Sequence, residues 1–162
     1  MGKKSVKENK NIYQKSRETA GLSRESAEEV LGFVSADRIE RIESGRSMPH
    51  PEEVLAMEQG YKNHELANYY CTHECPIGIK YMPRANLKPL SQLTVELISS
   101  LNAMEKEKDR LIDIAVDGRV NSFEREQFDS ILEKLVTLDR TISGMRIWIE
   151  HALSSGKMDE AE

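Results

Sequence analysis

Hydrophobic positions in the second half of the chain recur at spacings of three and four residues, the period of one face of an α-helix. Two segments show this pattern, residues 90–117 and residues 122–153, and a short polar stretch around Gly118 joins them. The second segment repeats more strictly, at Phe128, Ile131, Leu135, Leu138, Ile142, Met145, Ile149 and Ala152. Two long apolar stripes joined by a short turn predict an antiparallel helical hairpin over residues 90–153.

Shorter helical patterns, each ended by Gly or Pro, occupy the first half of the chain. They predict five helices, at about residues 11–20, 23–31, 35–44, 51–60 and 64–73. The third has the clearest limits, because Ser35 is a natural N-cap and Gly45 can take the left-handed conformation that ends a helix. Ile39 and Ile42 lie on one face of it, and Pro49 prevents the helix from resuming.

Several short features of this half match one known family. They are the Leu22-Ser23 start and Leu31-Gly32 end of the second helix, Ser35 opening the third, Ile39 with Ile42-Glu43-Ser44-Gly45, and Pro49 before the fourth. Residues 11 to about 70 therefore resemble the lambda-repressor-like helix-turn-helix domain of XRE-type bacterial transcriptional regulators. The resemblance implies a five-helix domain whose third helix enters the major groove of double-stranded DNA, and a dimer that reads two half-sites.

The resemblance also implies a set of DNA-contacting positions at the start of the second helix and along the third. They are Arg24, Ser35, Ala36, Asp37, Arg38, Arg41 and Arg46. Arg38 or Arg41 would pair with a guanine edge, whereas Arg24 and Arg46 would contact phosphate. Lysines of the first ten residues could add further phosphate contacts.

Two departures from the family pattern bear on this expectation. The turn from Gly32 to Ser35 is one residue longer than usual, and Glu28 stands where a small residue normally packs the second helix against the third. Either change could tilt the third helix. Acidic residues also offset the arginines of this helix, so the reading surface is electrically neutral. The alternative is a degenerate helix-turn-helix domain that binds a protein partner instead of specific DNA.

The predicted fold is therefore all-α, with a five-helix lambda-repressor-like domain followed by a long helical hairpin. We expect a flexible basic arm at 1–10, the helix-turn-helix domain at 11–75, a linker at 76–89, the hairpin at 90–153 and a flexible tail at 154–162. The linker assignment rests on four Pro and Gly residues without a sustained apolar period.

Composition and charge agree with two modules. Of the 162 residues, 31% are charged and 6% are aromatic, and the net charge is −5. Residues 1–24 carry seven basic and two acidic side chains, whereas residues 86–162 carry ten basic and fifteen acidic ones, so only the first module is suited to phosphate.

No apolar run is long enough for a membrane span or a signal peptide, which predicts a cytoplasmic protein. No nucleophile with a base and no phosphate loop is visible, so we expect neither an enzyme nor a cofactor.

The predicted hairpin has more apolar surface than two helices can cover. Leu132, Val136, Ile147 and Trp148 lie off the main stripe of the second long helix. Exposing them would cost roughly 25 cal/mol per Å². We therefore expect a homodimer through residues 90–153, with a four-helix core.

Two local patterns admit a metal. Cys71, His73 and Cys75 combine thiol and imidazole ligands, although small buried cysteines or an oxidation-sensitive thiol pair would explain them as well. Residues 113–124 fit part of a calcium-binding EF-hand loop, but position 3 is Ala115. A helix-to-helix turn with Asn121 or Ser122 as the cap explains the same residues without calcium.

Overall fold

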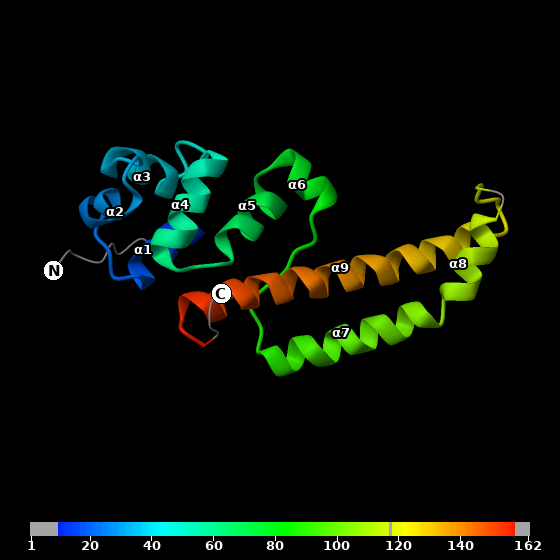
Figure 1. The fold of residues 1–162 in the computed structure, drawn as a ribbon. Coiled ribbons are helices and arrows are strands. Elements are labelled where there is room, and N and C mark those ends of the chain that lie inside the picture. The colour runs from blue at the N-terminus through cyan, green and yellow to red at the C-terminus, as the bar shows by residue number, and fades with distance from the viewer. Residues whose placement is uncertain (1–9, 117, 158–162) are drawn as a thin grey trace. The chain divides into compact units, whose positions relative to one another are not determined.

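The computed structural model describes residues 10–116 and 118–157, and every regular element in these ranges is an α-helix. The helices are α1 (Ile12–Thr19), α2 (Arg24–Leu31), α3 (Ala36–Glu43), α4 (Pro51–Tyr61), α5 (Leu66–His73), α6 (Pro76–Tyr81), α7 (Leu90–Glu105), α8 (Lys108–Ala115) and α9 (Arg125–Ser154) (Figure 1). The prediction of an all-α fold is confirmed. The predicted basic arm, apart from Lys10, lies outside the described residues, as does the end of the predicted tail.

The chain forms two compact units. Unit 1 contains the residues up to Met82 together with those from Glu150 onward, and unit 2 contains residues 83–149. The C-terminal end of α9 therefore belongs with α1 to α6, although the sequence pattern placed it in the hairpin. No described helix combines the length and the apolar character that crossing a membrane requires.

Side-chain caps fix the starts of the first three helices of unit 1. Asn11, Ser23 and Ser35 each accept the backbone N–H three residues later, which satisfies a donor that the helix itself leaves unpaired. Gly45 follows α3 with φ +74°, a conformation that costs glycine little, so the predicted stop of this helix is confirmed.

The core of unit 1 is formed by apolar side chains from α1 to α5. Its buried members are Tyr13, Ala27, Leu31, Val34, Ile39, Ile42, Val54, Met57, Tyr61 and Leu66. Ile39 and Ile42 from α3 are the predicted anchors, and both are almost completely buried. Burial of each such side chain contributes about 1.5–3 kcal/mol, so α3 is held firmly from its inner face.

The contact between α2 and α3 differs from the prediction by one residue. The small buried residue of α2 is Ala27, whereas Glu28 is exposed and its carboxylate accepts the N–H of Ala36 at 3.0 Å. The longer turn is accommodated because Val34 enters the core while Phe33 remains 65% exposed. Glu28 therefore helps to cap α3 and does not wedge the two helices apart.

A short helix, α6, occupies the start of the segment predicted to be a linker. Pro76 stands in its first turn. Proline lacks a backbone N–H, and at this position the helix offers no acceptor for one, so no hydrogen bond is lost. α6 packs closely on α5 because Gly78 lies against the backbone of Cys71, where an added Cβ would overlap the carbonyl group. Pro76 thus begins a helix, and Gly78 allows that helix to pack closely on α5.

Unit 2 contains α7, α8 and most of α9. The helix predicted over residues 90–117 is interrupted at Lys106 and Glu107, where α7 ends and α8 begins. Glu107 is buried there, and its carboxylate accepts hydrogen bonds from Lys134 of α9 at 2.5 Å and from Arg110 at 2.8 Å. The break between α7 and α8 therefore coincides with a residue that is paired with α9.

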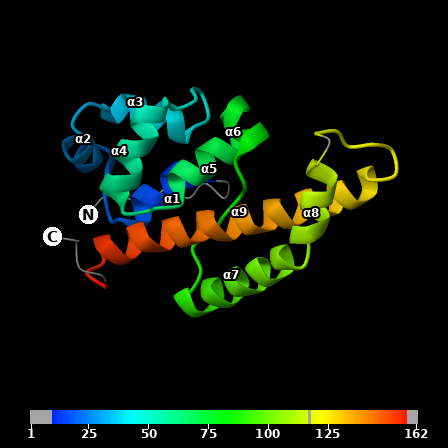
Figure 2. The same cartoon turned by 45° about the vertical axis from the view of Figure 1, so that its right-hand side comes forward.

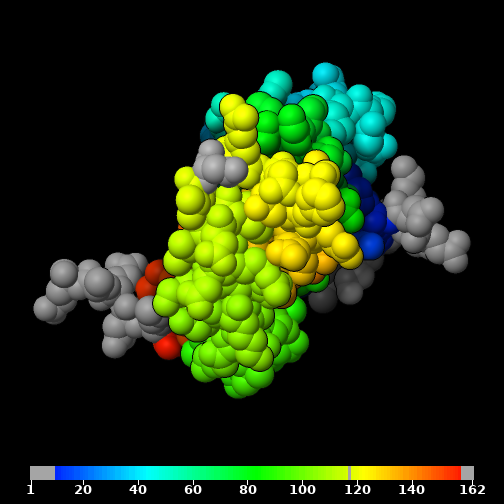
Figure 3. Space-filling view, turned by 90° about the vertical axis from the view of Figure 1, so that its right-hand side faces the viewer, coloured from blue at the N-terminus to red at the C-terminus, as the bar shows by residue number. Residues whose placement is uncertain are grey.

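α7 and α9 run side by side in opposite directions in both cartoon views (Figures 1 and 2). Leu93 of α7 is buried, and its Cδ2 would lie only 2.9 Å from a Cβ added to Gly144 of α9. The end of unit 2 near α8, which faces the viewer in Figure 3, carries the most exposed apolar side chains of the unit, Val116 and Phe123.

Candidate nucleic-acid interface

The candidate interface consists of α2, the turn after it and α3, with charged residues along the outer side of α3. Ala36 and Asp37 stand at the start of α3, directly after the cap Ser35, and Arg41 follows Asp37 by one turn. Asp37 and Arg41 are exposed, and Arg41 Nη2 lies 2.6 Å from a carboxylate oxygen of Asp37. Such an exposed pair contributes at most about 1 kcal/mol, so a ligand can replace either partner.

A buried ion network supports α3 from within. Glu43 at the end of α3 receives two hydrogen bonds from Arg17, at 2.5 and 3.0 Å, and one from Arg24 at 2.9 Å. Arg17 and Glu43 are only 6% and 7% exposed. Burial lowers the pKa of Arg17, but the hydrogen bond and negative charge of Glu43 outweigh that effect and raise it. Arg24, expected to contact phosphate, is thus directed toward Glu43.

Arg38, one of the two predicted guanine readers, connects α3 to the start of α4. Its guanidinium donates two bonds of 2.7 Å to the Glu53 carboxylate, one of 2.5 Å to Ser47 Oγ and one of 2.8 Å to the Met48 carbonyl. Glu53 also accepts the N–H of His50, at 2.7 Å. With these bonds satisfied inside the protein, Arg38 holds the loop after α3 in place.

Arg46 follows Gly45 and forms an ion pair with Glu40 on the surface of unit 1. Its side chain is 62% exposed, so it is accessible to a phosphate. Among the predicted contact residues, the structure brings Ser35, Ala36, Asp37 and Arg41 to the outer side of α3.

The electrostatic balance of this unit is acidic. Residues 11–75 carry seven basic and twelve acidic side chains. All five arginines in this range are paired with a carboxylate, and the pairs are Arg17 and Arg24 with Glu43, Arg38 with Glu53, Arg41 with Asp37, and Arg46 with Glu40. The sequence pattern missed Arg17 and Glu53, because their partners are distant in the chain and leave no local signal.

The candidate metal ligands near the end of α5 have other contacts. The His73 ring stacks on Tyr69 with a centroid distance of 4.3 Å, and its Nδ1 lies 3.0 Å from the Tyr69 carbonyl oxygen. Cys71 and Cys75 are free thiols, and Cys75 is the residue before α6. Within the described residues, no group of three or more His, Cys, Asp or Glu side chains is arranged to hold a metal ion.

The loop before α9 uses its polar residues to begin that helix. Asn121 Oδ1 accepts the N–H groups of Phe123 and Glu124, and the Glu124 carboxylate accepts the N–H of Asn121. This reciprocal arrangement has the bonds of a capping box and closes the turn that leads into α9. Asp117, which would be another calcium ligand, lies outside the described residues.

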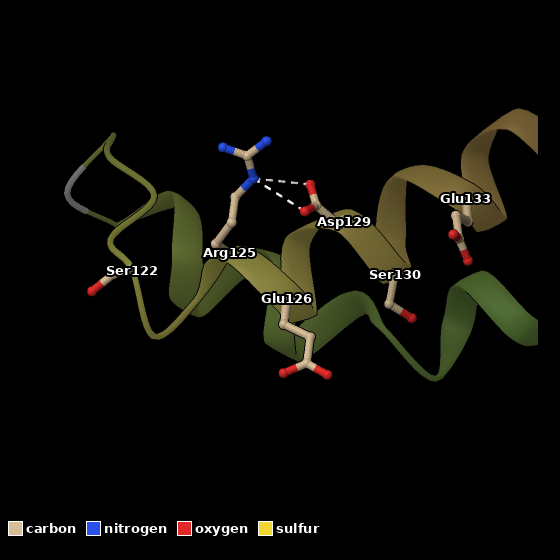
Figure 4. A pocket seen from close by; sticks show the side chains of 6 residues that line it. All are labelled: Ser122, Arg125, Glu126, Asp129, Ser130 and Glu133. Carbon is tan, nitrogen blue, oxygen red and sulfur yellow. Dashed lines mark hydrogen bonds and ion pairs between the residues drawn. The ribbon is translucent and has the colours of Figure 1, made fainter.

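A shallow hollow lies beside this start of α9 (Figure 4). It is lined by Ser122, Arg125, Glu126, Asp129, Ser130 and Glu133. Arg125 is directed toward Asp129, with both carboxylate oxygens 3.1 Å from its Nε, while Glu126 points away from that pair. The lining side chains therefore do not converge on one point, as those of a small-molecule site would.

Together, the capped α2 and α3, the left-handed Gly45 and the buried Ile39 and Ile42 define a helix-turn-helix domain. Residues 14–63 match a protein family described as a helix-turn-helix domain, in agreement with the XRE-type resemblance. No curated protein and no solved structure matches the chain. The matched range covers most of α1, all of α2 to α4 and the DNA-contacting positions predicted on α2, on α3 and just after α3.

Proposed function

We propose that the protein is a cytoplasmic transcription regulator that binds specific DNA sequences as a homodimer. The helix-turn-helix match over residues 14–63 carries this proposal, because that domain class places its second helix, here α3, in the major groove. The firm inner face of α3 supports it, since a reading helix must be presented rigidly.

In this proposal, Asp37 and Arg41 read bases together. An arginine can donate two hydrogen bonds to guanine, and an aspartate can accept one from the N4 amino group of cytosine. Both side chains are exposed and lie one turn apart, so they can reach neighbouring base pairs. Arg38 and Arg24 then position α3 through Glu53 and Glu43, and Arg46 contacts phosphate.

Binding to a random duplex library, followed by anisotropy titration of the selected duplexes at several salt concentrations, tests this proposal. We expect affinity to fall steeply with salt, because phosphate neutralisation releases counterions. Arg41→Ala should weaken binding to the selected duplex by about 1–3 kcal/mol and relax its sequence preference. Arg46→Ala is the matched control, since it should weaken all duplexes equally. Absence of binding to any duplex at low salt would overturn the proposal.

The homodimer rests on the apolar surface of unit 2. Several of its side chains on α7, α8 and α9 are more than half exposed, among them Val95, Ile98, Ile112 and Val136. Exposed apolar area of this kind is characteristic of interaction surfaces. Light scattering on the full chain tests the homodimer, and a monomeric mass at micromolar concentration would contradict it.

A second candidate function is binding to a protein partner through the helix-turn-helix domain. The pairing of all five arginines and the acidic balance of residues 11–75 favour it, because a DNA-binding face normally carries uncompensated positive charge. The same library experiment separates the two functions, since this candidate requires no duplex binding at any salt concentration.

A further inference from the structure

One stripe of side chains on α9 is exposed, although its residues follow the spacing that is typical of coiled coils. It contains Leu135, Asp139, Ile142, Arg146 and Ile149, whose spacings alternate between four and three residues. The apolar members are 39%, 38% and 37% exposed, and the two charged members are also exposed. Positions with this alternation form one continuous line along a helix, and apolar residues at such positions normally pack against another helix.

α7 does not cover this stripe. It meets α9 at Gly144, which lies against Leu93, and Glu107, the residue before α8, accepts a hydrogen bond from Lys134 of α9. Neither Gly144 nor Lys134 belongs to the stripe. Within the part of the chain that the structure describes, Asp139 and Arg146 have no ion pair or hydrogen-bond partner, so their charges are available to a further molecule.

The order of residues in the stripe identifies the partner. Read in either direction it runs apolar, charged, apolar, charged, apolar, with an acid on one side of Ile142 and a base on the other. A second copy of α9 packed antiparallel, with a two-fold axis near Ile142, therefore places Asp139 beside Arg146 of the second copy, twice. A parallel copy would place each charge beside its own equivalent, which is repulsive.

We propose that two copies of the chain associate through this stripe, with their α9 helices antiparallel and centred on Ile142. Leu135 then packs beside Ile149 of the second copy, and Ile142 packs on its own equivalent at the axis. Such a contact is isologous, because the same patch serves on both sides. This inference rests on the proposed homodimer. It adds which side of α9 forms the contact, that the two helices run antiparallel, and that Ile142 lies at the centre.

Charge reversal in the full chain tests the orientation. Asp139→Arg and Arg146→Asp each place two like-charge contacts in the antiparallel dimer, so each should raise the dimer dissociation constant at least about tenfold. The double variant D139R/R146D restores both pairs and should return the constant close to that of the wild type. Sedimentation equilibrium gives the constants, and circular dichroism verifies that each variant is folded. Glu126→Arg is the control, because Glu126 is exposed on α9 but lies off the stripe.

Mixing the two single variants gives a stricter test. One variant then presents two arginines and the other two aspartates, so the antiparallel heterodimer has both pairs intact although each homodimer is repelled. We expect a heterodimer of near wild-type affinity. A wild-type monomer would overturn this inference and the proposed homodimer together. A dimer that responds to Asp139→Arg no more than to Glu126→Arg, or variants that fail to associate on mixing, would overturn the register alone.

Discussion

At the scale of single residues, Glu43 has the largest expected effect on stability. It neutralises the buried Arg17 and also holds Arg24. Glu43→Ala leaves the Arg17 guanidinium buried without its carboxylate, which typically costs about 3–5 kcal/mol. Urea unfolding followed by circular dichroism measures this change. Asp37→Ala, which breaks an exposed pair, should cost less than about 1 kcal/mol, and similar losses in the two variants would contradict the buried network.

Glu58 makes the stability of unit 1 depend on pH. Its pKa is raised from 4.5 to about 7, mainly by burial and further by the charge of the nearby Glu150, although a hydrogen bond from the Ala67 N–H opposes both effects. A carboxyl whose folded pKa is raised favours folding at low pH, and this contribution is lost as pH rises from about 4.5 to above 7.

Glu58→Gln removes this titration and keeps an oxygen for the Ala67 N–H. We expect the variant to be more stable than the wild type at pH 8, by roughly 1–3 kcal/mol, and equal to it near pH 4. Urea unfolding across this pH range provides the measurement. If the wild type were instead more stable than the variant at pH 8, the ionised carboxylate of Glu58 would be stabilising.

Single residues of the candidate site differ in how far their contacts could be predicted from the sequence. The pattern located α3 correctly, because caps and apolar spacing act within one helix, and two of the residues it named there, Asp37 and Arg41, are exposed. It could not assign the partners of Arg24 and Arg38. A long guanidinium side chain takes the carboxylate that the tertiary fold brings near it, and those carboxylates belong to other parts of the sequence.

At the scale of elements, the packing of α6 on α5 depends on one glycine. Gly78→Ala would place a methyl group on the carbonyl of Cys71, so one of the two helices must shift. We expect a loss of about 1–3 kcal/mol, as for overpacked contacts. Lys80→Ala on the exposed side of α6 should change stability by less than about 0.5 kcal/mol. Thermal unfolding of both variants measures the difference, and an equal Tm would argue against the close contact.

The residues at which helices begin were predicted better than the residues at which a helix is interrupted. Ser23, Ser35 and Pro51 mark starts through interactions within the first turn, so the local sequence contains the whole signal. At the break between α7 and α8, Glu107 pairs with Lys134 of another helix, and α6 packs closely on α5. Both are tertiary effects, and neither changes the apolar period along the chain.

At the scale of the whole molecule, unit 1 is assembled from two separate parts of the chain. Ala152 is completely buried, His64 Nε2 lies 2.7 Å from Ser154 Oγ, and the rings of His64 and His151 are 6.0 Å apart. The helix-turn-helix match over residues 14–63 therefore omits residues that complete the unit.

A chain that ends at Ile149 should lose part of the stability of unit 1. We expect its Tm to fall by roughly 4–8 °C for each kcal/mol lost, and amide exchange at Ile39 and Ile42 to become faster. A chain that ends at Lys157 is the control, because it keeps Ala152 and Ser154. Unchanged exchange at the α3 core after the shorter truncation would mean that the end of α9 contributes nothing to unit 1.

The divided unit also constrains the order of events during synthesis. Residues up to Met82 leave the ribosome first, but residues from Glu150 onward emerge only after residues 83–149 have been translated. At roughly 5–20 residues per second, this delay lasts several seconds. During that time the surface that later covers Ala152 is open to solvent and to other nascent chains. The helix-turn-helix domain thus acquires its final stability only when α9 is nearly complete.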